Sequence, residues 1–222
     1  MSFVRYCIDE CMDIWEKCLH SEFLTKLQDG SLPEDCFKGY IVDDSLYLRE
    51  YAKVFAWGMT KATDMDSIRT YYSLLAFVNE GEGNTRVKYL ERYGLKDSEI
   101  QYLPQRPENK AYTDCMINAA KNGEGAPDCI MACLPCMISY AWIFREIAKA
   151  NSEVLNTVYG PLIKDYISEG YADACRSWAE YGNSVCEGLS EAKKRRCMEI
   201  FRSCSAHELN FWSMSEKPRN DI

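Results

Sequence analysis

Helical periodicity runs through nearly the whole chain and constrains its fold more than any other feature. The first segment, residues 3–27, illustrates the pattern. Its apolar side chains recur at spacings of three and four and mark one helix face: Val4, Cys7, Cys11, Ile14 and Cys18. No stretch has the strict alternation of a half-buried strand. The sequence therefore predicts an all-α fold, a single-domain multi-helix bundle that covers residues 1–222.

Turn residues divide the helical pattern into seven segments. The predicted helices cover 3–27, 33–60, 65–93, 107–122, 128–149, 153–187 and 190–214. The letters S-L-P-E at 31–34 have the form of a capping box that would open the second helix. Residues 79–84 form an acidic turn or helix break within the third segment, and Gly160 and Gly170 interrupt the sixth.

The charge balance disfavours a nucleic-acid partner. The formal net charge is −8, whereas a nucleic-acid surface is basic. The basic run at 193–196 is flanked by Glu191 and Glu199, which is typical of a solvated helix face.

Two segments bear on membrane insertion and location. The N-terminal residues carry acids where a signal peptide has its apolar core. The most apolar stretch, 129–144, is shorter than the roughly 20 residues of a membrane span and contains Pro135. We expect a buried helix here, no membrane partner, and a cytoplasmic protein.

The chain contains 12 cysteines, and most of them fit a reduced apolar core. One pair, Cys133 and Cys136 in C-L-P-C, could be a redox couple, half a zinc site, or a nucleophile beside a bystander. Zinc would need a second ligand pair, and no other C-x-x-C exists. A thioredoxin-type couple needs a βαβ context, which is absent. His20 and His207 are the only histidines, and neither has the spacing of a bundle di-iron site, so no metal is predicted.

Several helix faces carry a polar group where a core residue is expected. Asp44 interrupts an aromatic stripe in the second helix, and Glu208 interrupts the stripe of the last helix. Cys136 and Tyr140 share a face of the apolar helix. Buried carboxylates are costly unless they are hydrogen-bonded, so these residues indicate either structural hydrogen bonds or a polar pocket inside the bundle.

Four motifs together make the sequence similar to the TenA family, the thiaminase II or aminopyrimidine aminohydrolase group. They are D-D-S-L-Y-L at 43–48, L-P-C at 134–136, the region of Tyr166, and S-A-H-E-L-N-F-W at 205–212. The similarity extends over nearly the whole chain.

The resemblance implies a haem-oxygenase-like helical bundle without haem, assembled as a homotetramer and needing no cofactor. It also implies a hydrolase of thiamin salvage that replaces the group on the C5 methylene of a 4-amino-2-methylpyrimidine. The aminomethylpyrimidine would yield hydroxymethylpyrimidine and ammonia, and thiamin would lose its thiazole.

The roles of the site residues also follow from the resemblance. Cys136 matches the nucleophile that adds to C6 of the ring, and Glu208 matches the acid/base that protonates a ring nitrogen. Asp44 matches the carboxylate that holds the aminopyrimidine edge, and Tyr47 matches a tyrosine that tunes the cysteine. The matches to pocket tyrosines and to a ring-stacking wall are Tyr112, Tyr140, Tyr166 and Phe211.

The chain departs from the family pattern at three positions. His207 stands where an aromatic residue is common, and Met137 and Ile138 are apolar where relatives are bulkier or more polar. These departures bear on substrate preference. A second hypothesis remains, a catalytically weak pyrimidine- or thiamin-binding or regulatory protein of the same fold. The low histidine count disfavours a third, a metal-dependent oxygenase.

Overall fold

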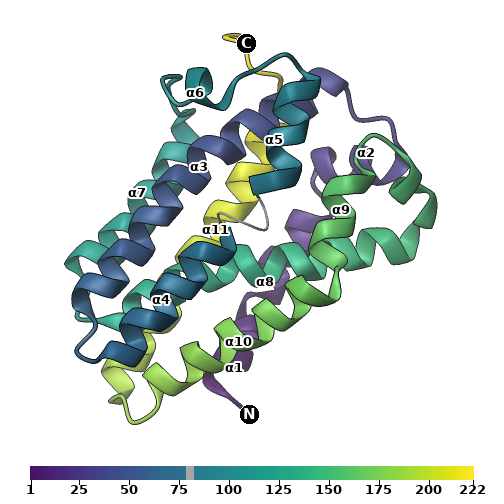
Figure 1. Ribbon diagram of the computed structural model, residues 1–222. Helices are drawn as coiled ribbons and strands as arrows, with labels where there is room; N and C mark the ends of the chain where they lie inside the picture. Colours follow the sequence, from purple (N-terminus) through teal and green to yellow (C-terminus); the bar gives the residue numbers. More distant parts are fainter. Residues whose placement is uncertain (79–82) are drawn as a thin grey trace.

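The computed structural model describes residues 1–78 and 83–222, and over these residues the chain is helical, without strands (Figure 1). The predicted all-α fold is confirmed. The helices are α1 (Phe3–Leu19), α2 (Glu22–Asp29), α3 (Glu34–Lys61), α4 (Met65–Phe77), α5 (Gly83–Arg92), α6 (Asp97–Ile100), α7 (Pro107–Asn122), α8 (Ala126–Ala150), the 3₁₀ helix η2 (Ser152–Asn156), α9 (Gly160–Ile167), α10 (Glu169–Cys186) and α11 (Glu191–Ser215).

Short polar side chains begin several of these helices by accepting a hydrogen bond from a first-turn backbone N–H. The residues that do so at the starts of α1, α2, α4, α10 and α11 are Ser2, Ser21, Asp64, Ser168 and Ser190. Each cap satisfies a donor that has no partner within the helix. Local sequence therefore determines where much of the bundle's helical structure begins.

Helix α8 lies at the centre of the bundle. It packs against α3, α7, α9, α10 and α11, and its residues from Cys129 to Leu134 have no exposed surface. By length and composition it could cross a membrane, but 78% of its apolar window is buried inside the protein. The prediction of a buried helix over this stretch is therefore confirmed.

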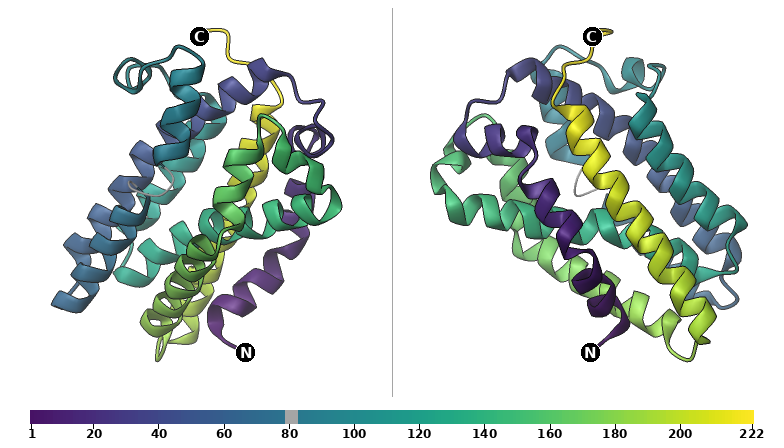
Figure 2. Two further views of the ribbon diagram at one scale, coloured as in Figure 1. Left: turned by 45° about the vertical axis from the view of Figure 1, so that its right-hand side comes forward. Right: turned by 180° about the vertical axis from the view of Figure 1, so that it is seen from behind.

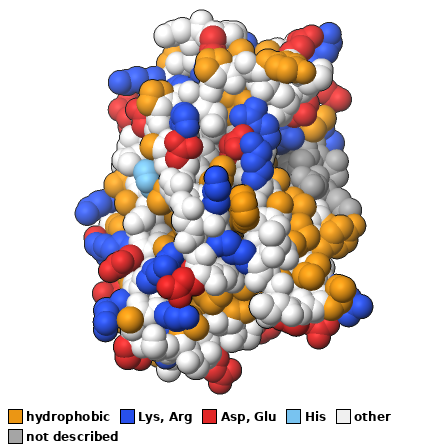
Figure 3. Space-filling model, turned by 90° about the vertical axis from the view of Figure 1, so that its left-hand side faces the viewer, with side chains coloured by type: hydrophobic (Ala, Val, Ile, Leu, Met, Phe, Trp, Pro, Cys, Tyr) orange, Lys and Arg blue, Asp and Glu red, His pale blue; other side chains and the backbone are white. Residues whose placement is uncertain are grey.

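The other long helices surround α8. Helix α11 packs against α1, α7 and α8, and α3 packs against α4 and α7. Seen from behind, α1 lies beside α11, and the chain termini lie at opposite ends of the bundle (Figure 2). Basic and acidic side chains are interspersed on the face drawn in Figure 3. These contacts bring residues of α3, α7, α8 and α11 into one interior.

Two predictions about the N-terminal third are wrong. The helix predicted over 3–27 is divided, because Ser21 caps a new helix, α2. The capping box at 31–34 does not form. The backbone N–H groups of Ser31 and Leu32 bond to the Lys26 carbonyl at the end of α2, and α3 begins after Pro33 without a side-chain cap.

The later boundaries agree more closely with the predicted ones. Helix α7 has the predicted bounds, and α11 is shifted by one residue at each end. The break at Gly160 is confirmed, while the second break of that segment falls at Ser168, two residues before the predicted Gly170. Helix α6 was not predicted. The turn expected at 79–84 falls largely outside the described residues.

Candidate active site

Glu208 lies at the centre of a group of polar side chains inside the bundle. It projects from α11 and is 1% exposed. The Tyr112 hydroxyl of α7 donates a hydrogen bond of 2.6 Å to its Oε1 atom, and a side-chain hydrogen bond joins it to Cys136 of α8. Three helices therefore place an acid, a phenol and a thiol together.

Burial determines the protonation of this acid. It raises the pKa of Glu208 from 4.5 to about 8, because a buried carboxylate loses the solvation of its charge. The hydrogen bonds to Tyr112 and Cys136 lower the pKa, and the nearby Asp44 raises it. Glu208 is therefore mostly protonated at neutral pH and can donate a proton.

Cys136 lies on α8 directly after Pro135, which is inside the helix. Proline lacks a backbone N–H, so one hydrogen bond of the α8 ladder is missing there. The Tyr51 hydroxyl donates a hydrogen bond of 2.9 Å to the nearby Cys133 carbonyl and joins α3 to α8 at this point. Cys136 is 9% exposed.

The two cysteines of C-L-P-C have different surroundings. Cys133 has no exposed surface, and burial raises its pKa well above the ordinary value. Cys136 instead shares a hydrogen bond with the catalytic candidate Glu208. All 12 cysteines are free thiols. The geometry favours a single functional thiol over a thiol pair.

Tyrosine and phenylalanine rings enclose this group. The ring of Tyr47 lies 5.0 Å from that of Tyr112 and 5.9 Å from that of Phe211, centroid to centroid. Its hydroxyl donates to the Met116 sulfur at 3.5 Å, and burial, followed by the proximity of Cys136, raises its pKa well above 10. We conclude that Tyr47 remains a neutral phenol beside the thiol.

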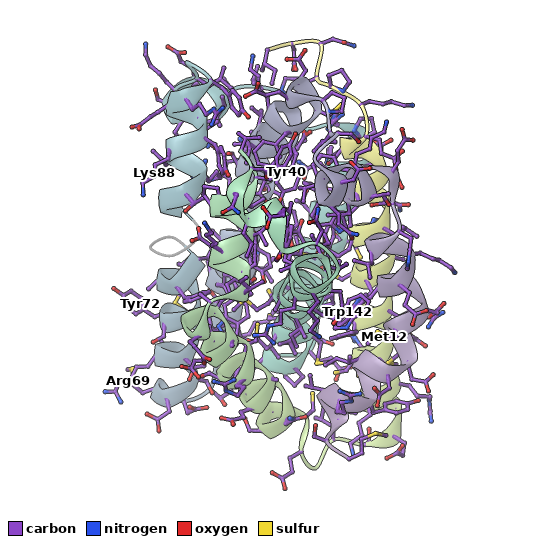
Figure 4. The ribbon with its side chains drawn as sticks, turned by 90° about the vertical axis from the view of Figure 1, so that its right-hand side faces the viewer. Met12, Tyr40, Arg69, Tyr72, Lys88 and Trp142 are labelled. Carbon is purple, nitrogen blue, oxygen red and sulfur yellow. The ribbon has the colours of Figure 1, made fainter. Side chains whose placement is uncertain are left out.

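A second set of buried rings adjoins this group. The ring of Tyr140 lies 5.1 Å from that of Tyr166 and 4.9 Å from that of Trp212. The rings of Tyr40 and Trp212 stack with their centroids 5.5 Å apart. Figure 4 shows Tyr40 in the interior of the bundle, while Lys88 projects from its edge. The rings form a continuous apolar wall.

A pocket of about 180 Å³ opens at the outer end of this wall. Its lining residues come from α3, α4, α5, α9 and α10: Asp44, Phe77, Thr85, Arg86, Leu162, Asp165, Tyr166, Ser168, Gly170 and Tyr171. Burial raises the pKa of Asp44 to about 7, while the adjacent Arg86 lowers it and Asp43 raises it. Asp44 is therefore poised between its charged and neutral forms at the pocket wall.

The structure brings all the predicted site residues into one region but at two depths. Asp44 and Tyr166 line the pocket. The others lie behind it in the bundle and connect through the contact between Tyr140 and Tyr166. Asp44 also acts electrostatically on Glu208, which places the two carboxyls in the same interior.

Two polar features of the site region were not predicted from sequence. Arg86 of α5 faces Asp44 across the pocket and donates hydrogen bonds to Ser45 at 2.7 Å and Asp97 at 2.8 Å. No local pattern distinguishes this arginine from a surface residue.

The second feature is a buried ion cluster behind Asp44. Asp43 has no exposed surface and pairs with Arg106 of the α6–α7 connection and, at 2.6 Å, with Arg219 of the C-terminal segment. The Asn109 amide also donates to the Asp43 carbonyl at 2.8 Å. The adjacent acids in D-D-S-L-Y-L thus face different environments, and the first anchors the C-terminal segment against α3.

Within the described residues, no group of three or more His, Cys, Asp or Glu side chains is placed to hold a metal ion. The interior polar groups of the site instead hydrogen-bond to each other.

Comparison with known proteins identifies the family. The model of the TENA/THI-4/PQQC family matches residues 8–217. The chain belongs to this family. The TENA/THI-4/PQQC match includes every predicted site residue from Asp44 to Phe211, and the resemblance to TenA proteins is confirmed.

Individual relatives match over almost their full lengths. The aminopyrimidine aminohydrolase of Halalkalibacterium halodurans is 30% identical over 99% of this chain and 97% of that protein. The aminopyrimidine aminohydrolase of Helicobacter pylori is 29% identical over 97% of this chain and 99% of that protein. The solved structure of a TenA homologue from P. horikoshii OT3 has a TM-score of 0.84 and 26% identity, covering 97% of this chain and 98% of that one.

Proposed function

We propose that the protein is an aminopyrimidine aminohydrolase that replaces the amino group on the C5 methylene of 4-amino-5-aminomethyl-2-methylpyrimidine with hydroxyl. The observation that carries the proposal is the buried group in which Glu208 shares hydrogen bonds with Tyr112 and Cys136. The family match and the two relatives with this name support it.

The reaction begins with addition of the Cys136 sulfur to C6 of the pyrimidine. A neutral pyrimidine accepts a thiolate only if a ring nitrogen is protonated as the C–S bond forms. Glu208 is suited to supply this proton because its pKa is raised to about 8 by burial. Tyr112 orients the carboxyl through the 2.6 Å hydrogen bond.

Elimination and hydration complete the cycle. Electrons from the adduct expel the amine from the C5 methylene, and the thiol proton leaves with it as ammonia. Water adds to the exocyclic carbon as hydroxide, the C–S bond breaks, and the remaining proton of the water restores the Cys136 thiol. The ring nitrogen returns its added proton to Glu208 as the aromatic ring is restored. The covalent adduct converts a difficult displacement into two easier steps. Thiamin could enter the same cycle with its thiazole as the leaving group.

The surrounding residues position the ring. Asp44, with a pKa of about 7, can accept a hydrogen bond from the 4-amino edge. Tyr47 adjusts the surroundings of the thiol, while Phe211 and the tyrosines at 112, 140 and 166 provide flat apolar surfaces. Such walls bind a planar heterocycle and exclude water.

Matched cysteine substitutions test the mechanism. We expect Cys136→Ser to abolish release of ammonia from the aminomethylpyrimidine, because serine is a far weaker nucleophile at this position. Cys133→Ser, three residues away on the same helix, should retain substantial activity. Circular dichroism should show both variants folded. Unchanged turnover in Cys136→Ser would refute the adduct, and equal loss in both variants would restore a role for the thiol pair.

A direct assay separates catalysis from simple binding. Purified protein is incubated with the aminomethylpyrimidine and with thiamin, and the hydroxymethylpyrimidine released is measured. Calorimetry on the same sample measures ligand affinity. Binding without product would favour the alternative, a pyrimidine- or thiamin-binding or regulatory protein.

Three proposals concern organisation: one domain over residues 1–222 and a cytoplasmic location, both expected from the sequence, and a homotetramer, which the family resemblance implies. Light scattering tests the assembly, since a tetramer has four times the mass of the chain.

A further inference from the structure

A second reactive group lies behind the proposed catalytic acid and takes no part in the mechanism. It consists of Cys115 on α7 with Cys204 and His207 on α11. Side-chain hydrogen bonds join Cys115 to Cys204 and to His207. His207 is also one of the three positions at which the chain departs from the family pattern.

Helix spacing places this group beside Tyr112 and Glu208 of the candidate active site. Cys115 follows Tyr112 by three residues on α7, and Cys204 precedes Glu208 by four residues on α11. The rings of Tyr112 and His207 stack with centroids 5.5 Å apart and planes 9° apart. The thiols therefore lie about one helical turn from the hydrogen bond between Tyr112 and Glu208.

The two thiols differ in pKa and in exposure to solvent. Hydrogen bonding from Cys204 and then His207 lowers the pKa of Cys115, whereas the same bond raises the pKa of Cys204 well above its ordinary value. Cys115 is partly exposed and Cys204 has no exposed surface. A partly exposed thiolate beside a buried thiol is the arrangement in which one sulfur reacts with an oxidant and the other resolves the product.

We propose that Cys115 is a peroxide-reactive site and that its oxidation produces a Cys115–Cys204 disulfide joining α7 to α11. The Cys115 thiolate attacks one oxygen of a hydroperoxide, the O–O bond breaks, and the other oxygen leaves as water or alcohol after taking a proton. Cys204 then attacks the sulfur of the sulfenic acid and displaces hydroxide, which takes the Cys204 proton as water. With hydrogen peroxide, two thiols and one peroxide become one disulfide and two waters.

The disulfide would act on the proposed catalytic acid. A disulfide holds its sulfurs about 2 Å apart, closer than any hydrogen-bonded contact, so the Cys115 and Cys204 side chains must move toward each other at the contact between α7 and α11. The hydrogen bond from Tyr112 to Glu208 spans these same helices. Oxidation should therefore change turnover, and a thiol reductant should restore it.

Peptide mapping tests the site without any activity assay. The reduced protein is treated with stoichiometric hydrogen peroxide, its remaining thiols are alkylated, and it is digested with trypsin without reduction. Cys115 and Cys204 are the only cysteines of tryptic peptides 111–121 and 203–219. We expect these peptides to appear cross-linked. Absence of the cross-linked pair, while Cys115 is consumed or remains a thiol, would overturn the proposal.

The chain provides an internal control. Cys175 is the other partly exposed cysteine, but it bonds to the Met137 carbonyl at 3.5 Å and lies alone in peptide 165–176. It should stay reduced while Cys115 reacts. Equal reactivity of Cys115 and Cys175 toward peroxide would contradict the activation of Cys115 by Cys204 and His207.

Two variants separate the steps. Cys204→Ser should halt the reaction at the Cys115 sulfenic acid, which a cyclic 1,3-dione probe traps. His207→Phe preserves a ring against Tyr112 but removes its hydrogen-bonding nitrogen, and it should slow oxidation of Cys115 severalfold. An unchanged rate in His207→Phe would refute the role of His207.

The effect on turnover rests on the proposed function, and the peptide mapping does not. Reversible inhibition by peroxide should disappear in Cys115→Ser. If the cross-link forms in a protein without hydrolase activity, the proposed function fails and the oxidation site stands. If turnover responds identically in Cys115→Ser and the wild type, the coupling to Glu208 is refuted.

Discussion

Replacing Glu208 with glutamine should change how the stability of the protein depends on pH. Burial raises the pKa of this carboxyl from 4.5 to about 8. Between these values the folded protein holds a proton that the unfolded chain has released, so the free energy of unfolding falls as pH rises. At about 1.4 kcal/mol per pH unit, this interval corresponds to about 5 kcal/mol. This contribution of Glu208 to the free energy of unfolding is fully present below pH 4.5 and is lost by about pH 8.

Glutamine has no proton to lose, and its carbonyl oxygen can still accept the Tyr112 hydrogen bond. The difference in unfolding free energy between Glu208→Gln and the wild type should therefore shift in favour of the variant from pH 5 to pH 9. Urea titrations across this range measure it. Glu199→Gln, at an exposed position on the same helix, is the control. A difference that does not vary with pH would refute the raised pKa of Glu208.

Two further substitutions test the surroundings of the site. Tyr112→Phe removes a hydrogen bond that lowers the pKa of Glu208, so the alkaline limb of the pH–rate profile for pyrimidine hydrolysis should move to higher pH. A shift to lower pH would contradict this assignment. Asp43→Ala leaves the buried Arg219 with one carboxylate partner fewer and should cost about 3 to 5 kcal/mol of unfolding free energy. An unchanged urea midpoint would show that this ion pair does not anchor the C-terminal segment.

Local sequence predicts much of the helical structure because capping and periodicity act over a few residues. Pro107 begins α7 and Gly123 follows its end, and the Gly-Pro pair at 160–161 marks the break before α9. The capping box at 31–34 fails because the end of α2 captures the backbone donors of Ser31 and Leu32. Competition between two neighbouring helix ends cannot be judged from the motif alone.

The sequence by itself also determines that Asp44 and Glu208 interrupt apolar faces, since spacings of three and four place them among core residues. Both are buried in the structure. The family resemblance adds Cys136 and the pocket tyrosines by matching their positions.

Only the tertiary structure decides which of these faces meet. The hydrogen bond between Tyr112 and Glu208 joins residues 96 positions apart, and the ion pair between Asp43 and Arg219 joins residues 176 positions apart. Arg86 is set against Asp44 by the packing of α5 on α3. Periodicity specifies the face on which a side chain lies, but contacts between helices depend on how their surfaces fit together. The raised pKa values of Asp44 and Glu208, which the proposed chemistry needs, arise from that packing.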